Sequence, residues 1–264
     1  MQKSSPKNAL SLWCYRAIRW VVRVFFPKYT VEGLENLPQG PCIVAGNHAQ
    51  MNGPIACELY FPDRSATWCT AEMMQLHTVP NYAYTDFWSQ KPRWNRWFYR
   101  LLSYIIAPVS VCIFHNAHTI PVYHDSRIMS TFRQTVEHLQ QGQRVVIFPE
   151  HTQPYNRIVN HFQDKFIDTA RLYYRRTGEA LSFVPLYVAP AFRKLYLGKP
   201  ITFDPHVPVE QERQRICQHL MDAVTALAQT LPCHTVTPYD NIPKRNYPQS
   251  RPPEVSPSHE ETCC

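Results

Sequence analysis

The sequence predicts an α/β protein with a mixed, largely parallel sheet flanked by helices, and with an amphipathic helix at its N-terminus. Two stretches predict the sheet. Apolar residues at helical spacing over 128–141 are followed by a short apolar run at 145–148, and a second such helix at 162–176 is followed by a run at 183–188. Strand–helix–strand units of this kind place successive strands parallel in one sheet, with the helices covering it.

The first element is a stretch without proline or glycine, residues 9–26, in which Arg16, Arg19 and Arg23 recur on one side of a helix. Trp, Phe and Val side chains surround them. This arrangement predicts a basic amphipathic helix in the headgroup region of a membrane, and a surface helix packed on the domain is the alternative. The arginines interrupt the apolar run, which argues against a signal peptide and against a transmembrane span.

Two stretches in the first half of the chain are ambiguous. The segment 79–100 is rich in Trp, Tyr and Arg without a clear period, and is a loop, a lid or a membrane-facing insertion. The run 101–114 is the most apolar, but it contains Pro108 and is shorter than the roughly 20 residues that span a bilayer. It predicts a core helix or one that dips into the membrane. The elements expected before them are strands at 29–33, 42–46 and 66–71 and a helix at 55–60.

The last third of the chain predicts a closing hairpin or edge pair at 194–203 and a final helix at 210–231. From residue 232 onward the sequence is rich in proline, serine and charge, which predicts an extended or disordered tail. The predicted organisation therefore has three parts. They are a membrane-interface helix at 1–27, an α/β domain at 28–231 and a tail at 232–264.

The net charge of +7 and the aromatic content of 13% favour an anionic partner, and lipid headgroups and nucleic acids both qualify. Because the arginines of the first helix alternate with bulky apolar residues, we expect membrane lipids and no nucleic acid. The nine cysteines include no pair with the spacing of a zinc or redox site, which favours reduced thiols in the cytoplasm. The oligomeric state is not predicted.

One histidine stands where a buried strand turns into a polar loop. His48 follows the apolar run 42–46, with Gly46 before it and Gly53 after it. Histidine suits the role of a general base because its ordinary pKa, about 6.5, lets it accept and return a proton near neutral pH. The alternative is a structural histidine that makes one hydrogen bond.

Three further stretches accompany this histidine in a particular order, and two of them begin as apolar strand-like runs. Together with the His48 stretch they resemble the four sequence blocks of the glycerolipid acyltransferase family, which includes 1-acylglycerol-3-phosphate acyltransferases. The resemblance spans residues 29–205. The three stretches are Thr119–Arg127, Arg144–Thr152 and Ser182–Val188.

The resemblance implies that His48 is the catalytic base. In the family pattern an Asp follows the histidine after four residues and orients it, whereas this chain has Gly53 at that position. Asn52 is the expected substitute, because its side-chain carbonyl could accept a hydrogen bond from imidazole Nδ1. Glu58 and Glu72 are the alternatives.

The resemblance also implies where the acceptor binds. Family members hold the acceptor phosphate with arginines of the second and third blocks, and here those positions are His124 and Gln153. These side chains bind a dianion more weakly than a guanidinium does. We therefore expect an acceptor that is a larger, neutral or zwitterionic lipid, or a polar non-lipid hydroxyl or amine. The expected acceptor-binding residues are His124, Arg127, Glu150, His151 and Thr152.

The function expected from these residues is transfer of a fatty acyl group from acyl-CoA or an acyl carrier protein thioester to a lysophospholipid-like acceptor. The protein would lie peripherally on the cytoplasmic face of the membrane, and it would need no cofactor or metal beyond the thioester. Gly53 favours an alternative, a degenerate homologue that binds lipids or acyl chains without turnover. A less favoured alternative is a metal-dependent hydrolase whose ligands would be His48, His124, Glu150 and His151.

Overall fold

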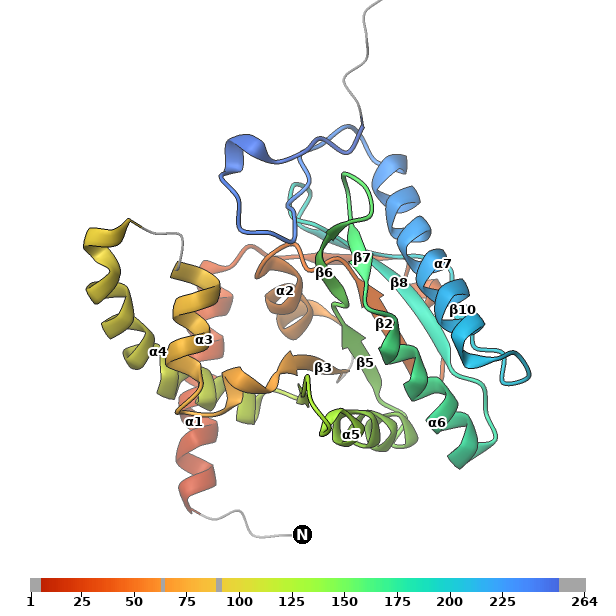
Figure 1. The fold of residues 1–264 in the computed structure, drawn as a ribbon, viewed down its shortest axis with the longest axis horizontal. Coiled ribbons are helices and arrows are strands. Elements are labelled where there is room, and N and C mark those ends of the chain that lie inside the picture. Colours follow the sequence, from red (N-terminus) through yellow and green to blue (C-terminus); the bar gives the residue numbers. More distant parts are fainter. Residues whose placement is uncertain (1–5, 63–64, 89–91, 252–264) are drawn as a thin grey trace, which may run out of the picture.

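The structure, a computed structural model, describes residues 6–62, 65–88 and 92–251, and its centre is a sheet with helices on both faces (Figure 1). The strands of this sheet are β1 (Thr30–Glu32), β2 (Cys42–Gly46), β3 (Ser65–Thr70), β4 (Thr119–Val122), β5 (Arg144–Ile147), β8 (Ser182–Ala189), β9 (Lys194–Leu197) and β10 (Ile201–Thr202). Their order is β1-β9-β8-β2-β5-β3-β4, with β10 paired to β8. Because β8 runs antiparallel to β9 and β10 while the other pairs are parallel, the predicted mixed, largely parallel α/β fold is confirmed.

Helices cover the sheet unequally. The α-helices are α1 (Pro6–Phe25), α2 (Asn52–Tyr60), α3 (Val79–Ala83), α4 (Arg96–Asn116), α5 (Ile128–Gln140), α6 (Asp168–Thr177) and α7 (Val209–Thr230). Short helical turns are η1 (Leu34–Asn36), η2 (Ala71–Met74), η3 (Tyr84–Trp88), η4 (Arg93–Asn95), η5 (Asp164–Ile167) and η6 (Lys244–Asn246). The helices α5, α6 and α7 share a core with one face of the sheet, whereas α2 packs on the other (Figure 1).

The central strand β2 is buried on both faces. Ile43 and Ala45 belong to the core under α5, α6 and α7, and Cys42 and Val44 belong to the core under α2. A strand enclosed in this way has no polar face, which explains why its sequence is continuously apolar. The rigid end of β2 carries His48.

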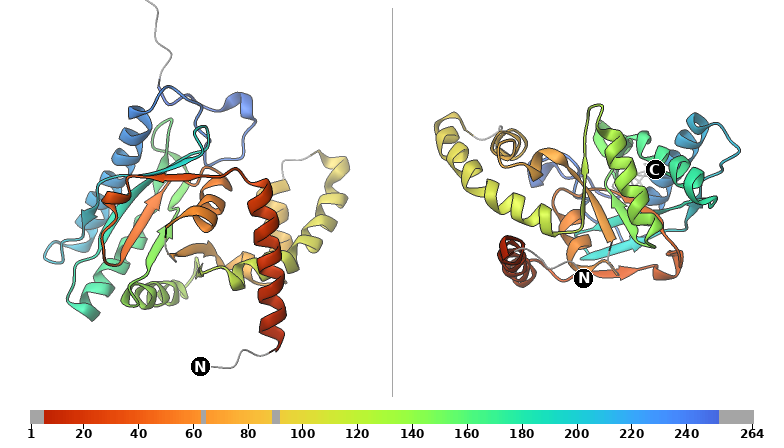
Figure 2. Two further views of the ribbon diagram at one scale, coloured as in Figure 1. Left: turned by 180° about the vertical axis from the view of Figure 1, so that it is seen from behind. Right: turned by 90° about the horizontal axis from the view of Figure 1, so that it is seen from below.

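The helices α1, α3 and α4 form a separate lobe beside the sheet (Figure 2). α1 contacts α4 and α2 directly: Asn116 donates to Ser11 Oγ at 2.7 Å, and Arg19 Nε pairs with Glu58 at 3.3 Å. The N-terminal helix is therefore present as predicted, and one of its arginines faces the domain. Its outward side carries exposed apolar residues that include Trp13, at 67% exposure.

The apolar run 101–114 belongs to a longer helix than the sequence suggested. α4 extends over 96–116 because the Trp- and Tyr-rich residues before the run are helical as well, and Pro108 lies inside the helix. In the part of the chain that the structure describes, 93–116 forms one helix long and apolar enough to cross a membrane, judged by length and composition only, and most of it is not buried. The prediction that this segment is too short to span a bilayer was therefore wrong.

The expected pairing at 194–203 needs correction. β9 lies between β1 and β8, whereas β10 pairs with the beginning of β8, so the two strands do not form a hairpin with each other. The ribbon of β6 (Glu150–Pro154) and β7 (Asn160–Phe162) was not predicted, because neither strand has an alternating apolar pattern.

The disordered tail expected from residue 232 is also corrected in its first part. Residues 232–251, which we call the C-terminal segment, are held by hydrogen bonds and bury Val236 at 1% exposure. Composition missed this because a proline-rich segment can be ordered by packing on a folded domain. Residues 252–264 lie outside the described residues.

Candidate active site

His48 and Glu150 lie at the carboxyl ends of neighbouring parallel strands. β2 and β5 pair in register with Ala45 opposite Ile147, and each functional residue follows its strand by two or three positions. In sheets of this kind, ligands bind at the carboxyl ends of the strands. The structure therefore brings the first and third sequence blocks together, which the sequence alone could not show.

The Glu150 carboxylate holds two main-chain segments. It is 4% exposed, and it accepts hydrogen bonds from the main-chain N–H groups of His48 at 2.5 Å and Asn160 at 2.9 Å. Burial raises the pKa of Glu150 to about 7, the two N–H donors oppose that shift, and the charge of Asp240 adds to it. Glu150 thus fixes the backbone of the candidate base.

The His48 imidazole is oriented by a main-chain carbonyl. Its Nδ1 is hydrogen-bonded to the carbonyl oxygen of Gln50. Because a carbonyl only accepts, Nδ1 carries the proton and Nε2 holds the free lone pair. The ring is edge-on to Phe148 and Tyr239, with ring centres 5.3 and 5.9 Å away. Burial lowers the pKa of His48, which the Gln50 carbonyl opposes, so the neutral base predominates at pH 7.

An unusual backbone turn supplies that carbonyl. Ala49 and Gln50 have φ angles of 47° and 56°, a left-handed conformation that costs a residue with a Cβ roughly 1–2 kcal/mol. Such a conformation persists where the surrounding contacts enforce it, and it clusters at functional sites. No feature of the sequence marks this turn, since neither residue is Gly, Asn or Asp.

The residues expected to orient the histidine lie differently. Asn52 donates from its side chain to the Ala49 carbonyl at 2.9 Å, so its amide caps the turn and the Gln50 carbonyl is the partner of Nδ1. Gly53 has no room for a side chain: a Cβ there would lie 2.7 Å from the His48 carbonyl oxygen and 2.8 Å from the Phe148 ring. Position 53 therefore has no room for the carboxylate that the resemblance would place there.

The two alternative carboxylates are also engaged elsewhere. Glu58 accepts from Tyr15 at 2.5 Å and pairs with Arg19, which ties α1 to α2. Glu72 is hydrogen-bonded to the Thr70 hydroxyl beyond β3. The sequence offered no signal for these pairings, because each joins residues through the tertiary fold or a local turn.

Asn47 is a site residue that sequence reasoning did not single out. Its side chain is 1% exposed and bridges to β8, accepting from the Val188 N–H at 2.7 Å and donating to the Val188 carbonyl at 3.2 Å. It thereby extends the pairing of β2 with β8 by one residue. The residue that precedes His48 is therefore held against β8.

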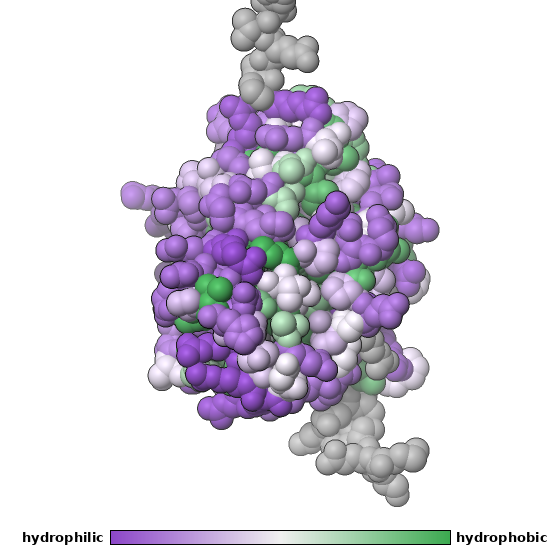
Figure 3. Space-filling view, turned by 90° about the vertical axis from the view of Figure 1, so that its right-hand side faces the viewer, coloured by the Kyte–Doolittle hydropathy of each residue, from purple (hydrophilic) through white to green (hydrophobic). Residues whose placement is uncertain are grey.

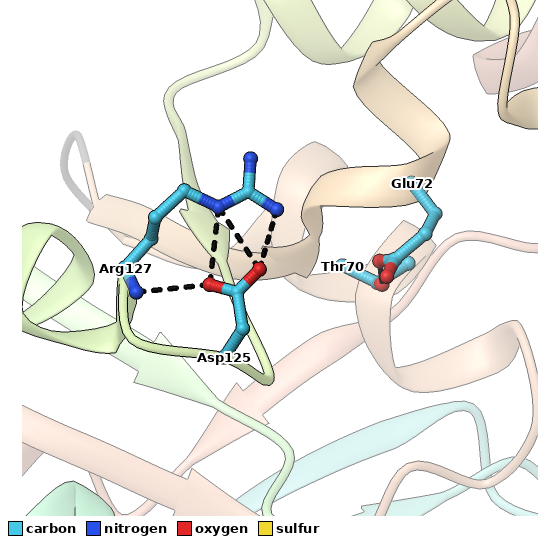
Figure 4. Close-up of polar contacts among 4 residues, drawn as sticks. All are labelled: Thr70, Glu72, Asp125 and Arg127. Atoms are coloured by element: carbon cyan, nitrogen blue, oxygen red, sulfur yellow. Dashed lines mark hydrogen bonds and ion pairs between the residues drawn. The ribbon is translucent and has the colours of Figure 1, made fainter.

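The second-block residues lie at the edge of the sheet. His124 and Arg127 follow β4, which is separated from β2 by β5 and β3, or about 14 Å at the usual strand spacing. Both are exposed. Arg127 pairs with Asp125 at 2.7 Å (Figure 4), and its guanidinium also lies over the Tyr123 ring at 4.4 Å. Its guanidinium is therefore already neutralised by a carboxylate.

The third-block residues after Glu150 point along the β6–β7 ribbon. The His151 ring stacks on His161 at 6.1 Å and its Nδ1 accepts from the Gln153 N–H at 3.2 Å, while Thr152 is exposed. Among residues 6–62, 65–88 and 92–251, no group of three or more His, Cys, Asp or Glu could hold a metal ion. The hydrolase alternative thus finds no ligand set in that part of the chain.

Comparisons with known proteins identify the family of this chain. The family model described as "Acyltransferase" matches residues 28–189, which is more than half of the chain, and the protein belongs to this acyltransferase family. No curated protein matches significantly. One similar solved structure is the 1-acyl-sn-glycerophosphate (LPA) acyltransferase PlsC from Thermotoga maritima, at 16% identity, with 85% of this chain and 84% of that chain covered and a TM-score of 0.47. The family assignment follows from the sequence match.

Proposed function

We propose that this protein transfers a fatty acyl group from acyl-CoA or an acyl carrier protein thioester to a lysophospholipid-like acceptor, with His48 as general base. One observation carries the proposal: Nδ1 of His48 donates to the Gln50 carbonyl, which leaves Nε2 as a basic nitrogen in a site that keeps the ring neutral. Family membership supports acyl transfer. The orienting carbonyl favours an enzyme over a degenerate lipid-binding homologue.

The chemical step is displacement at the thioester carbonyl. Nε2 of His48 accepts the proton of the acceptor hydroxyl as its oxygen attacks the carbonyl carbon. The tetrahedral intermediate collapses with cleavage of the C–S bond, and the imidazolium returns the proton to the leaving thiolate. Glu150 contributes by fixing the His48 main chain, and the thioester is the only co-substrate that this chemistry needs.

The acceptor is proposed to lack a recognised phosphate dianion. Arg127 is paired with Asp125 on the surface, and the other candidate positions are His124 and Gln153. A guanidinium occupied by a carboxylate must lose that partner before it binds phosphate. We therefore expect the protein to use a neutral or zwitterionic lysolipid with an affinity comparable to that for lysophosphatidate.

Membrane lipids are the proposed partner of α1 and α4, the two long helices of the lobe beside the sheet. Apolar residues are exposed on both helices, among them Trp20 at 67%, Phe25 at 83% and Leu101 at 53%. The face of the molecule that carries α7, seen in Figure 3, is mostly hydrophilic. Bulky apolar side chains next to arginines fit the interfacial region of a bilayer, and reduced thiols favour its cytoplasmic side.

A matched pair of variants tests the membrane contact. Leu101→Ser is expected to weaken co-sedimentation with anionic phospholipid vesicles several-fold. Leu34→Ser removes a leucine of similar exposure, 48%, in η1 near β1, and it should bind as the original protein does. Equal binding by all three proteins would contradict the proposed membrane face.

The enzymatic proposal is tested with long-chain acyl-CoA, acyl carrier protein thioester and a panel of lysolipids, following free thiol and acylated product. We expect product with the original protein and none above background with His48→Ala. The control is His206→Ala, an exposed histidine in the loop before α7. Product that persists in His48→Ala would remove His48 from the mechanism, and no product with any donor or acceptor would contradict the function.

A further inference from the structure

The C-terminal segment reaches the loop that carries the candidate base. The Nε2 of Gln50 donates to the Asp240 carbonyl at 3.2 Å and to the Tyr247 hydroxyl at 2.9 Å. The Tyr239 ring stands edge-on to the His48 ring at 5.9 Å, with an angle of 87° between the rings. Both the side chain that begins this connection and the carbonyl that orients Nδ1 belong to one residue, Gln50.

The C-terminal segment is itself fixed to the sheet. The Nε2 of His234 is hydrogen-bonded to the Tyr187 hydroxyl on β8 at 2.7 Å. The ends of the segment are joined, because the Ser250 N–H donates to the His234 carbonyl at 2.9 Å and the Val236 N–H donates to that of Pro248 at 2.9 Å. The segment is a closed loop anchored on β8, and it can hold the Gln50 side chain in place.

The turn at Gln50 needs such support. Its left-handed φ of 56°, next to Ala49 at 47°, is a conformation that neither residue favours by itself. The side chain of Gln50 is held by two hydrogen bonds to the C-terminal segment, and the carbonyl of the same residue is hydrogen-bonded to Nδ1 of His48. Gly53 leaves no space for a side chain that could take over this role.

We propose that Gln50 is a positioning residue for His48, and that the C-terminal segment, through Asp240 and Tyr247, holds it in the conformation in which its carbonyl replaces the motif carboxylate of the family. This inference rests on the proposed role of His48 as the base. The orientation of His48 then depends on residues that follow the matched family region, which ends at residue 189.

Two variants separate the side chain of Gln50 from its backbone conformation. Gln50→Ala loses the hydrogen bonds and keeps the strain of a positive φ, whereas Gln50→Gly loses the bonds but adopts a positive φ without strain. We expect kcat to fall at least about tenfold in Gln50→Ala and less in Gln50→Gly, with the KM for acyl-CoA unchanged in both. If Gln50 had only a structural role, both variants would have the activity of the original protein once the folded fraction is taken into account.

Removal of one hydroxyl gives a milder test that preserves the loop sequence. Tyr247→Phe deletes the acceptor of the 2.9 Å bond and is expected to lower kcat about threefold to tenfold. The matched control is Tyr173→Phe on α6, which removes a hydroxyl that is hydrogen-bonded to Glu179, two residues after that helix. The control should retain full activity and both proteins should unfold at similar temperatures.

A measurement that does not depend on turnover distinguishes this inference from the proposed function. Ring-nitrogen NMR of His48, assigned by comparison with His48→Ala, is expected to show the Nδ1-protonated form in the original protein. In Gln50→Ala and Tyr247→Phe a part of the population should change to the Nε2-protonated form. An unchanged tautomer together with kcat within twofold would overturn the positioning role, even if His48→Ala is inactive. A shifted tautomer in a protein without acyltransferase activity would leave this inference standing and contradict only the proposed function.

Discussion

The centre of the candidate site and its β4 end differ in how their charged groups are held. At the centre, Glu150 is buried and bonded to two main-chain N–H groups, and it holds His48. At the β4 end, Arg127 and Asp125 form an exposed ion pair within one loop. An exposed pair contributes at most about 1 kcal/mol, whereas a buried carboxylate that loses its donors is costly. We therefore expect changes at the centre to affect activity more than changes at the β4 end.

The largest expected effect comes from placing a carboxylate beside His48, at position 53. Gly53→Asp should lower activity at least about a hundredfold, because a Cβ at this position approaches the His48 carbonyl to 2.7 Å and displaces the base. The matched control is Gly40→Asp, where a Cβ meets nothing within 4 Å. Activity that rises in Gly53→Asp would show that the loop is built to receive the carboxylate after all.

Glu150 gives the next largest effect, on stability and its pH dependence. The pKa of Glu150 in the folded protein, about 7, lies above the ordinary 4.5. The stabilisation that this shift gives the folded protein is therefore fully present below pH 4.5 and is lost as the pH rises through 7. As the pH rises across this range, the free energy of unfolding of the original protein should fall by at most about 3 kcal/mol more than that of Glu150→Gln.

Chemical denaturation at several pH values measures this difference. Glu137→Gln, an exposed change on α5, is the control and should follow the original protein. A Glu150→Gln variant with the same pH dependence as the original protein would mean that folding does not raise the pKa of Glu150.

A smaller effect is expected in the pH profile of kcat/KM. Burial lowers the pKa of His48 from 6.5, so the fraction of neutral base stays high at pH 6.5. Activity should be lost, by about tenfold per pH unit, only as the pH falls through a value below 6.5. Steady-state assays at saturating donor locate this limb, and a midpoint above 6.5 would be inconsistent with a desolvated imidazole.

The smallest effect is predicted at the β4 edge. Arg127→Ala should change kcat/KM for a zwitterionic lysolipid by less than about threefold, because the guanidinium is exposed and paired with Asp125. Arg133→Ala, an exposed change on α5, serves as control. A tenfold or larger loss confined to lysophosphatidate would identify Arg127 as a phosphate ligand and bring this chain closer to the family pattern.

The sequence predicted the sheet and its strand ends well, because β2, β5 and β8 are buried on both faces and therefore appear as continuous apolar runs. It also pointed to His48, whose role as base stays a prediction. It could not predict that Gln50 orients the ring, since main-chain carbonyls leave no signature and the supporting Tyr247 is almost two hundred residues away. The ordered C-terminal segment was missed for the same reason: its proline-rich composition is typical of a tail, while its order comes from contacts such as His234 with Tyr187.

One experiment separates a role of His48 as general base from a role in binding alone. Product formation and binding of a non-reactive acyl-CoA analogue are measured side by side in the original protein and in His48→Ala. We expect the variant to bind the analogue within about threefold of the original protein while product falls at least about a hundredfold. Equal product in the two proteins, or binding without product in both, would contradict it.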